Sequence, residues 1–138
     1  MALATPPIRV LVVEDEAFIR MDVVDVLRAA GFEVLEATNA EEAIQMLECN
    51  SDVRLVFTDI DMPGSMNGLK LAAAVRNRWP PVRIIATSGH VKIRAGDLPA
   101  GALFFPKPYQ PLQIIDAIRE LTSVGVMNYP SRQKGELQ

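Results

Sequence analysis

"LVFTDIDMPGSMNGLK", residues 55–70, passes from an apolar run into two acids, Asp59 and Asp61, and then into a turn-forming Met-Pro-Gly-Ser sequence. An apolar, β-branched run of this kind is typical of a buried strand. The acids then mark either a strand that reaches the protein surface or a strand that delivers reactive groups to a site. The rest of the chain decides between these interpretations.

Apolar runs alternate with segments of helical period along the sequence. The runs occupy residues 8–13, 32–37, 53–58, 82–87 and 102–106. Apolar residues recur at three- and four-residue steps in residues 16–31, 40–49, 68–79 and 111–122. This alternation predicts an α/β fold in which a doubly wound, five-stranded parallel sheet carries helices on both faces.

Local signals mark several helix ends. Gly31 is suited to end the first helix, and Asn39 with Glu42 three residues later is typical of a capped helix start. Pro80 should stop the third helix, while Pro111 suits the first turn of the last one.

The segment of residues 88–102 does not fit this regular pattern. Gly96, Pro99 and Gly101 interrupt any long helical period there. This is the position of the fourth of five expected helices, and we expect that helix to be short or disordered.

The length and composition predict one domain without a membrane or nucleic-acid partner. The chain has 138 residues, 49% of them hydrophobic, and a net charge of -3, which disfavours a basic face for nucleic acid. No apolar run approaches the roughly 18 to 20 residues of a membrane span, and no signal peptide is recognisable. We therefore expect a cytoplasmic protein with an N-terminal lead (1–7), one domain (8–122) and a flexible C-terminal tail (123–138).

Polar side chains follow four of the five predicted strands. They are Glu14, Asp15, Asp59, Asp61, Thr87, Ser88 and Lys107. In doubly wound sheets, ligands bind beyond the carboxyl ends of the strands, where the strand order reverses. Clustered carboxylates call for a hard cation such as Mg²⁺ (or Mn²⁺), and an ammonium and a hydroxyl can neutralise a phosphoryl group in transfer. An ionised aspartate can itself be the nucleophile, so the set predicts metal-assisted phosphoryl transfer.

In this order and spacing, these residues resemble the receiver domain of response regulators in two-component signalling. The resemblance covers residues 8–122 and is carried by "ED" (14–15), "DIDMP" (59–63), "NG" (67–68), "TSG" (87–89) and "KP" (107–108). It implies a flavodoxin-like sheet of strand order 2-1-3-4-5.

The resemblance also implies a role for each site residue. Asp59 would be the phosphoacceptor, and Ser88 and Lys107 would bind the phosphoryl group. The Lys107–Pro108 peptide is often cis in this family. Mg²⁺ would be held by Glu14, Asp15, Asp59 and the backbone carbonyl of Asp61.

Other assignments concern the regulation of such a site. Thr87 competes with Ser88 for the hydroxyl position, and Gly89 favours Ser88 because the family places a small residue directly after that hydroxyl. Asp61 and His90 occupy positions that tune the lifetime of the phosphoryl group, although His90 could equally be a solvated loop residue. Phe104 stands at the position of the switch aromatic.

The loop "MPGSMNG" (62–68) is one residue longer than the family pattern, and Met66 is expected to anchor it. Phosphorylation could act by ordering residues 89–101.

The expected activity is that of a single-domain regulator, not of a conventional enzyme: it would catalyse its own phosphorylation and dephosphorylation. Its partners would be a histidine kinase or histidine phosphotransfer protein, docking on the first helix, and an unidentified downstream protein.

Two rival interpretations remain. A haloacid-dehalogenase-like phosphatase would use Asp59 and Asp61, and a topoisomerase–primase-like metal site would use similar acids.

Overall fold

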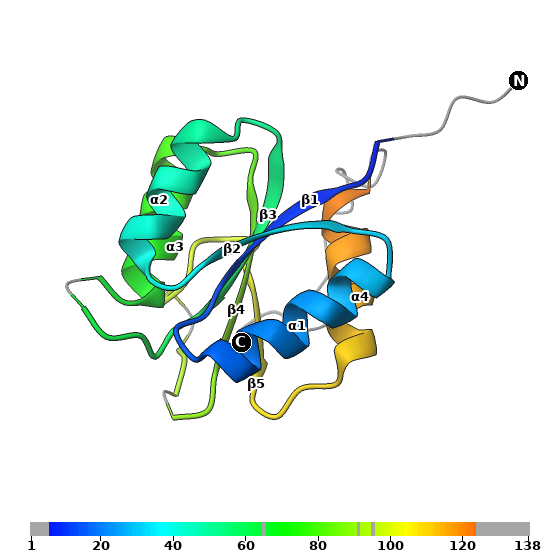
Figure 1. The fold of residues 1–138 in the computed structure, drawn as a ribbon. Coiled ribbons are helices and arrows are strands. Elements are labelled where there is room, and N and C mark those ends of the chain that lie inside the picture. Colours follow the sequence, from blue (N-terminus) through cyan, green and yellow to red (C-terminus); the bar gives the residue numbers. More distant parts are fainter. Residues whose placement is uncertain (1–5, 65, 91, 95, 124–138) are drawn as a thin grey trace, which may run out of the picture.

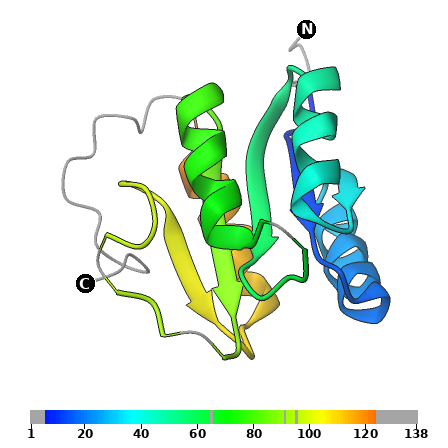
Figure 2. The same ribbon diagram turned by 90° about the vertical axis from the view of Figure 1, so that its left-hand side faces the viewer.

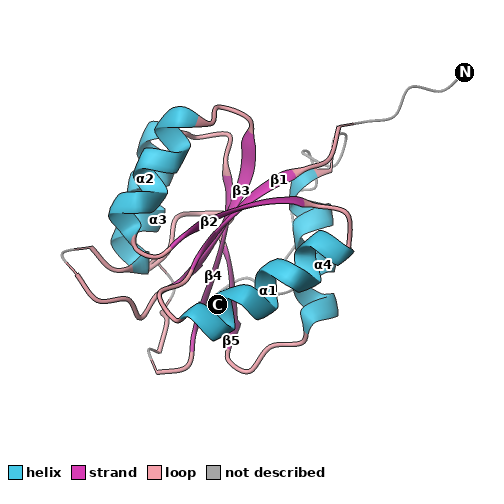
Figure 3. Cartoon of the chain, viewed as in Figure 1, coloured by secondary structure: helices cyan, strands magenta, loops and turns pink. Residues whose placement is uncertain are grey.

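Five parallel strands form one sheet through the centre of the molecule (Figures 1 and 3). The computed structural model describes residues 6–64, 66–90, 92–94 and 96–123. The strands are β1 (Arg9–Val13), β2 (Glu33–Ala37), β3 (Val53–Asp59), β4 (Arg83–Ser88) and β5 (Leu103–Pro106). Their spatial order is β2-β1-β3-β4-β5, which confirms the predicted order. The order reverses between β1 and β3, so a ligand site is expected beyond the carboxyl ends of these two strands.

In the described part of the chain, α1 (Ala17–Ala29) and α4 (Pro111–Thr122) cover one face of the sheet and α2 (Ala40–Cys49) and α3 (Gly68–Arg78) cover the other (Figures 1 and 2). Successive side chains of a strand point to opposite faces, and in β1 both sets are apolar. Val10 and Val12 pack with residues of α1 and α4, whereas Leu11 and Val13 pack with residues of α2 and α3. This double burial is what turns the strand sequences into continuous apolar runs.

The predicted helix ends are confirmed. Gly31, which follows the C-cap residue Ala30 of α1, has a φ of +99°, and its N–H donates to the carbonyl of Arg28. This left-handed conformation suits glycine and closes the helix. At the start of α2, the side chain of Asn39 accepts a hydrogen bond of 2.8 Å from the backbone N–H of Glu42. Pro111 lies in the first turn of α4.

The segment between β4 and β5 contains no helix among its described residues (88–90, 92–94 and 96–102). The fourth helix, which the sequence predicts to be short or disordered, is not formed by these residues, and the described chain has four helices instead of five. Gly96 and Gly101 adopt φ values of +94° and +85°, which end any helical turn. Leu98 is nevertheless buried with the residues of α2 and α3, so this irregular segment covers part of the same sheet face.

The structure describes only part of the predicted N-terminal lead and C-terminal tail. Most of the predicted tail, residues 124–138, and residues 1–5 of the predicted lead lie outside the described residues. Within the described residues, no helix has both the length and the apolar character needed to cross a bilayer.

Candidate functional site

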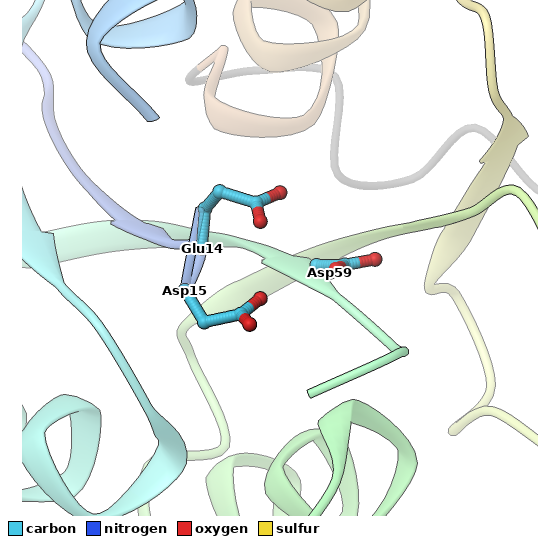
Figure 4. Close-up of side chains that lie close together, drawn as sticks. All are labelled: Glu14, Asp15 and Asp59. Atoms are coloured by element: carbon cyan, nitrogen blue, oxygen red, sulfur yellow. The ribbon is translucent and has the colours of Figure 1, made fainter. Parts of the chain in front are cut away.

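Three carboxylates meet where the strand order reverses (Figure 4). Glu14 and Asp15 directly follow β1, and Asp59 is the last residue of the neighbouring β3. Each contributes one carboxylate oxygen to a group whose atoms all lie within 4.8 Å of one another. Glu14 and Asp59 are buried, with only 4% and 3% of their surface exposed, while Asp15 is accessible to solvent. The structure thus brings together the acids that the sequence predicted to converge.

Lys107 supplies the positive charge of the site. Its Nζ lies 3.4 Å from Oδ1 of Asp59 and 3.5 Å from Oε1 of Glu14. The backbone N–H of Lys107 donates to the carbonyl of Ser88 at 2.9 Å, which fixes the loop beyond β5 against the end of β4. The Lys107–Pro108 peptide is cis, as the resemblance to receiver domains implies.

Burial controls the ionisation of the two inner acids. It raises the pKa of Glu14 to about 6, an effect opposed by the N–H of Glu16 and strengthened by the charge of Asp59. It also raises the pKa of Asp59, although the Lys107 ammonium and the N–H of Asp61 act in the opposite direction. Burial lowers the pKa of Lys107, but the charges of Asp59 and Glu14 raise it by more, so its net pKa is raised. The site therefore gains stability from any additional cation that neutralises its carboxylates.

The donor set fits a hard divalent cation. Three carboxylate oxygens from two adjacent strand ends approach one another closely, and such oxygens are the ligands that Mg²⁺ prefers. One of the acids is accessible to solvent, so water and a phosphate oxygen would be able to reach a cation held by these residues.

Backbone contacts hold Asp59 in place. The N–H of Asp61 donates to Oδ1 of Asp59 at 3.3 Å, and the N–H of Ile60 donates to the carbonyl of Thr87 at 2.8 Å. Gly68, at the start of α3, donates its N–H to the carbonyl of Ile60 at 3.1 Å. A Cβ atom at position 68 would contact the backbone carbonyl of Asp59 and lie 2.6 Å from the Cα of Ile60. Only glycine therefore allows α3 to approach the acid so closely.

The hydroxyls of β4 differ in their surroundings. Ser88 Oγ donates a hydrogen bond of 2.7 Å to Oδ2 of Asp61 and accepts one of 3.1 Å from the N–H of His90. The neighbouring Thr87 is also buried, but its Oγ1 has no hydrogen-bond partner among the described residues. Of these two hydroxyls, that of Ser88 is the one bonded to Asp61, the acid that follows β3.

The other residues predicted from the sequence, His90, Phe104 and Met66, lie outside the group formed by the acids, Lys107 and Ser88. His90 is exposed just beyond β4, and Phe104 is half-buried in β5 beside Ala86 of β4. Met66 is half-buried and packs on the core residues of α2 and α3, so its predicted role as the anchor of the loop before α3 is confirmed.

Sequence reasoning missed Arg20. This α1 residue donates from Nη1 to the backbone carbonyl of Glu14 at 2.9 Å and from Nε to Glu36 at 3.1 Å. It thereby ties the turn that carries Glu14 to the end of β2. No motif marks this contact, because it depends on how α1 and β2 pack together.

Comparisons with known proteins identify the family. The sequence profile of the response regulator receiver domain matches residues 10–119, and the chain belongs to this family of two-component signalling proteins. The chain is 37% identical over 119 residues to the chemotaxis protein CheY of Thermotoga maritima, an alignment that covers 83% of this chain and 97% of that protein. It is 35% identical over 116 residues to the sensor kinase CckA of Brucella abortus, covering 81% of this chain but 12% of the kinase.

Solved structures agree with this assignment. A response regulator receiver protein from Sinorhizobium medicae superposes with a TM-score of 0.80 at 28% identity, covering 86% of this chain and 96% of that one. The receiver domain of the hybrid histidine kinase CckA superposes with a TM-score of 0.71 at 31% identity, covering 83% and 99%. The fold and family are thus those of a receiver, and not of the phosphatases or topoisomerase–primase domains considered from the sequence.

Proposed function

We propose that this receiver domain accepts a phosphoryl group on Asp59 from a phosphohistidine donor and thereby switches its binding to a partner protein. The observation that carries the proposal is the pairing of one buried carboxylate, Asp59, with the ammonium of Lys107 at 3.4 Å, beside the acids Glu14 and Asp15. A nucleophile and the charges that stabilise a transferring phosphoryl group are thus already in contact.

Asp59 acts as the nucleophile. One carboxylate oxygen attacks the phosphorus, a P–O bond forms as the P–N bond to the donor imidazole breaks, and the leaving nitrogen takes up a proton from solvent. Lys107 exchanges part of its contact with Asp59 for a phosphoryl oxygen, and the Ser88 hydroxyl donates to another. Attack of water on phosphorus later restores the carboxylate, so the domain catalyses both its phosphorylation and its dephosphorylation.

A divalent cation, Mg²⁺ or Mn²⁺, is part of the proposal. Glu14, Asp15 and Asp59 would hold it together with the backbone carbonyl of Asp61. When bound, it would neutralise the acids and draw negative charge from the transferring phosphoryl group. The raised pKa of Glu14 and the closeness of the three carboxylates support this assignment.

Two further roles complete the proposed site. Asp61 and His90, which flank it after β3 and β4, tune the lifetime of the phosphoryl group. Phe104 changes its packing in response to phosphorylation and carries the change to the surface of β5.

The proposed phosphodonor docks on α1. Phe18 and Met21 expose 87% and 55% of their surface on this helix, and Leu112 at the start of α4 exposes 71%. A groove of about 490 Å³ runs between the two helices, and Lys107 contributes to its lining as well as to the acidic site. A histidine kinase or phosphotransfer protein bound here would therefore present its phosphohistidine next to Asp59. The downstream target is a second protein.

Incubation with acetyl phosphate and Mg²⁺ tests the proposal. We expect the wild type to gain one phosphoryl group that is stable in acid and labile in base. It should hydrolyse acetyl phosphate only as fast as it loses and regains that phosphoryl group. Repeated hydrolysis of varied phosphate esters would instead indicate a phosphatase. Measuring released phosphate against bound phosphate in the same sample distinguishes the two.

A further inference from the structure

The hydroxyl of Ser88 has its single proton committed to another acid. Ser88 Oγ lies 2.7 Å from Oδ2 of Asp61, and because a carboxylate only accepts, the hydroxyl must be the donor. The N–H of His90 donates to the same Oγ at 3.1 Å. Ser88 is buried, with 2% of its surface exposed, so water has little access to exchange these partners. In this arrangement the hydroxyl cannot donate to a group on Asp59.

Asp61 contacts both halves of the site. Its carboxylate accepts the proton of Ser88, and its backbone N–H donates to Oδ1 of Asp59 at 3.3 Å. A hydroxyl bonded to an ionised carboxylate is held more strongly than one bonded to a neutral acceptor. The half-buried position of Asp61 strengthens this bond further, because screening by water is reduced there.

We propose that Asp61 is a positioning residue that holds the Ser88 hydroxyl away from Asp59 until a phosphoryl group is present. This inference rests on the proposed function. A phosphoryl group on Asp59 adds negative oxygens beside Asp61, which compete for the same proton and repel the Asp61 carboxylate. The hydroxyl then rotates from Asp61 to the phosphoryl oxygen. Asp61 thus opposes the phosphorylated state through Ser88, in addition to any direct repulsion.

A double-mutant cycle separates the two contributions. The binding of beryllofluoride with Mg²⁺ is measured for the wild type, Asp61→Asn, Ser88→Ala and the double variant, by titration of intrinsic fluorescence or amide NMR signals. Asn keeps the shape of Asp but accepts the hydroxyl proton more weakly. Asp52→Asn, which removes one exposed charge just before β3, at the opposite end of the strand from Asp59, is the matched control.

We expect Asp61→Asn to tighten beryllofluoride binding by about tenfold when Ser88 is present, a factor that corresponds to about 1.4 kcal/mol. In the Ser88→Ala background the same change should tighten binding by at most about threefold, because only direct repulsion is then relieved. Asp52→Asn should leave the affinity unchanged.

Equal factors in the two backgrounds would overturn the inference and leave the proposed function intact. Failure of the wild type to bind beryllofluoride or to accept a phosphoryl group would overturn both. Circular dichroism and thermal unfolding of each variant establish that the comparison is made between folded proteins.

Discussion

The ammonium nitrogen of Lys107 lies 3.4 Å from Oδ1 of Asp59, although β4 separates the strand that ends in Asp59, β3, from the strand that precedes Lys107, β5. The contact is possible because parallel strands deliver their carboxyl ends to one edge. It also leaves the balance of charge incomplete, because one ammonium faces the buried carboxylates of both Asp59 and Glu14.

Glu14 should make stability depend on pH when no metal is bound. Its pKa is about 6 in the folded protein, mainly because of burial, compared with an ordinary value of 4.5. A group with a raised folded pKa stabilises the fold below its unfolded value and loses that contribution as the pH rises through the folded value. Between about pH 4.5 and 7, the wild type should therefore lose about 2 kcal/mol of unfolding free energy that Glu14→Gln retains.

Urea unfolding in EDTA at several pH values measures this difference. Glu48→Gln, an exposed change on α2, serves as the control and should follow the wild type. Parallel pH curves for the wild type and Glu14→Gln would contradict the assignment of a buried carboxylate with a raised pKa.

Gly68 should be intolerant of even one methyl group. A Cβ atom there would lie 2.6 Å from the Cα of Ile60 and collide with the carbonyl of Asp59, so α3 must move away from the site. We expect Gly68→Ala to lower the unfolding free energy by about 1–3 kcal/mol and to slow phosphorylation of Asp59. The matched control is Gly89→Ala, whose Cβ would meet the nearest atom of Lys107 at an ordinary 3.6 Å. Equal stability of the two variants would refute this account of the close approach.

Thr87 and Thr58 should respond oppositely to the same substitution. Both are buried, but Thr58 Oγ1 donates to the carbonyl of Asp59 at 2.9 Å, whereas Thr87 Oγ1 has no partner among the described residues. Removing an unpaired buried hydroxyl relieves its desolvation cost, so Thr87→Val should raise stability by about 1 kcal/mol. Thr58→Val should lower it by a similar amount. Chemical denaturation of both variants in the same buffer provides the comparison. Destabilisation by Thr87→Val would show that the hydroxyl of Thr87 stabilises the folded protein.

The segment between β4 and β5 should become more protected on activation. Its described residues are irregular, with Asp97 N–H bonded to the carbonyl of Arg94 and Leu98 buried on the sheet. We predict that phosphorylation orders residues 89–101, an order–disorder mode of switching. Amide exchange with and without beryllofluoride should show slower exchange in this segment, and Asp59→Asn should show no change. Unchanged protection in the wild type would reject the prediction.

The sheet and its order could be predicted because burial on both faces leaves unbroken apolar runs. Val10 to Val13 illustrate this: alternate residues pack against different pairs of helices, so all of them are apolar. The acids of the site were also recognisable, since they follow strands whose carboxyl ends must meet. The missing fourth helix was signalled in part by Gly96, Pro99 and Gly101.

Other features depend on packing between distant segments and leave no local pattern. The bond of Arg20 to the Glu14 carbonyl requires α1 to lie beside the end of β2. The bond from Ser88 to Asp61 requires particular side-chain conformations after two different strands. The closeness of Gly68 to Asp59 follows from the path of the loop before α3. Periodicity and motif spacing contain no information on such contacts.

The central claim is that Asp59, and not its neighbour Asp61, receives the phosphoryl group. Intact-protein mass spectrometry after treatment with acetyl phosphate and Mg²⁺, applied to the wild type, Asp59→Asn and Asp61→Asn, tests it most directly. We predict one added phosphoryl group on the wild type and on Asp61→Asn, none on Asp59→Asn, and none on any of them in EDTA. Labelling of Asp59→Asn to the same extent as the wild type would contradict the claim.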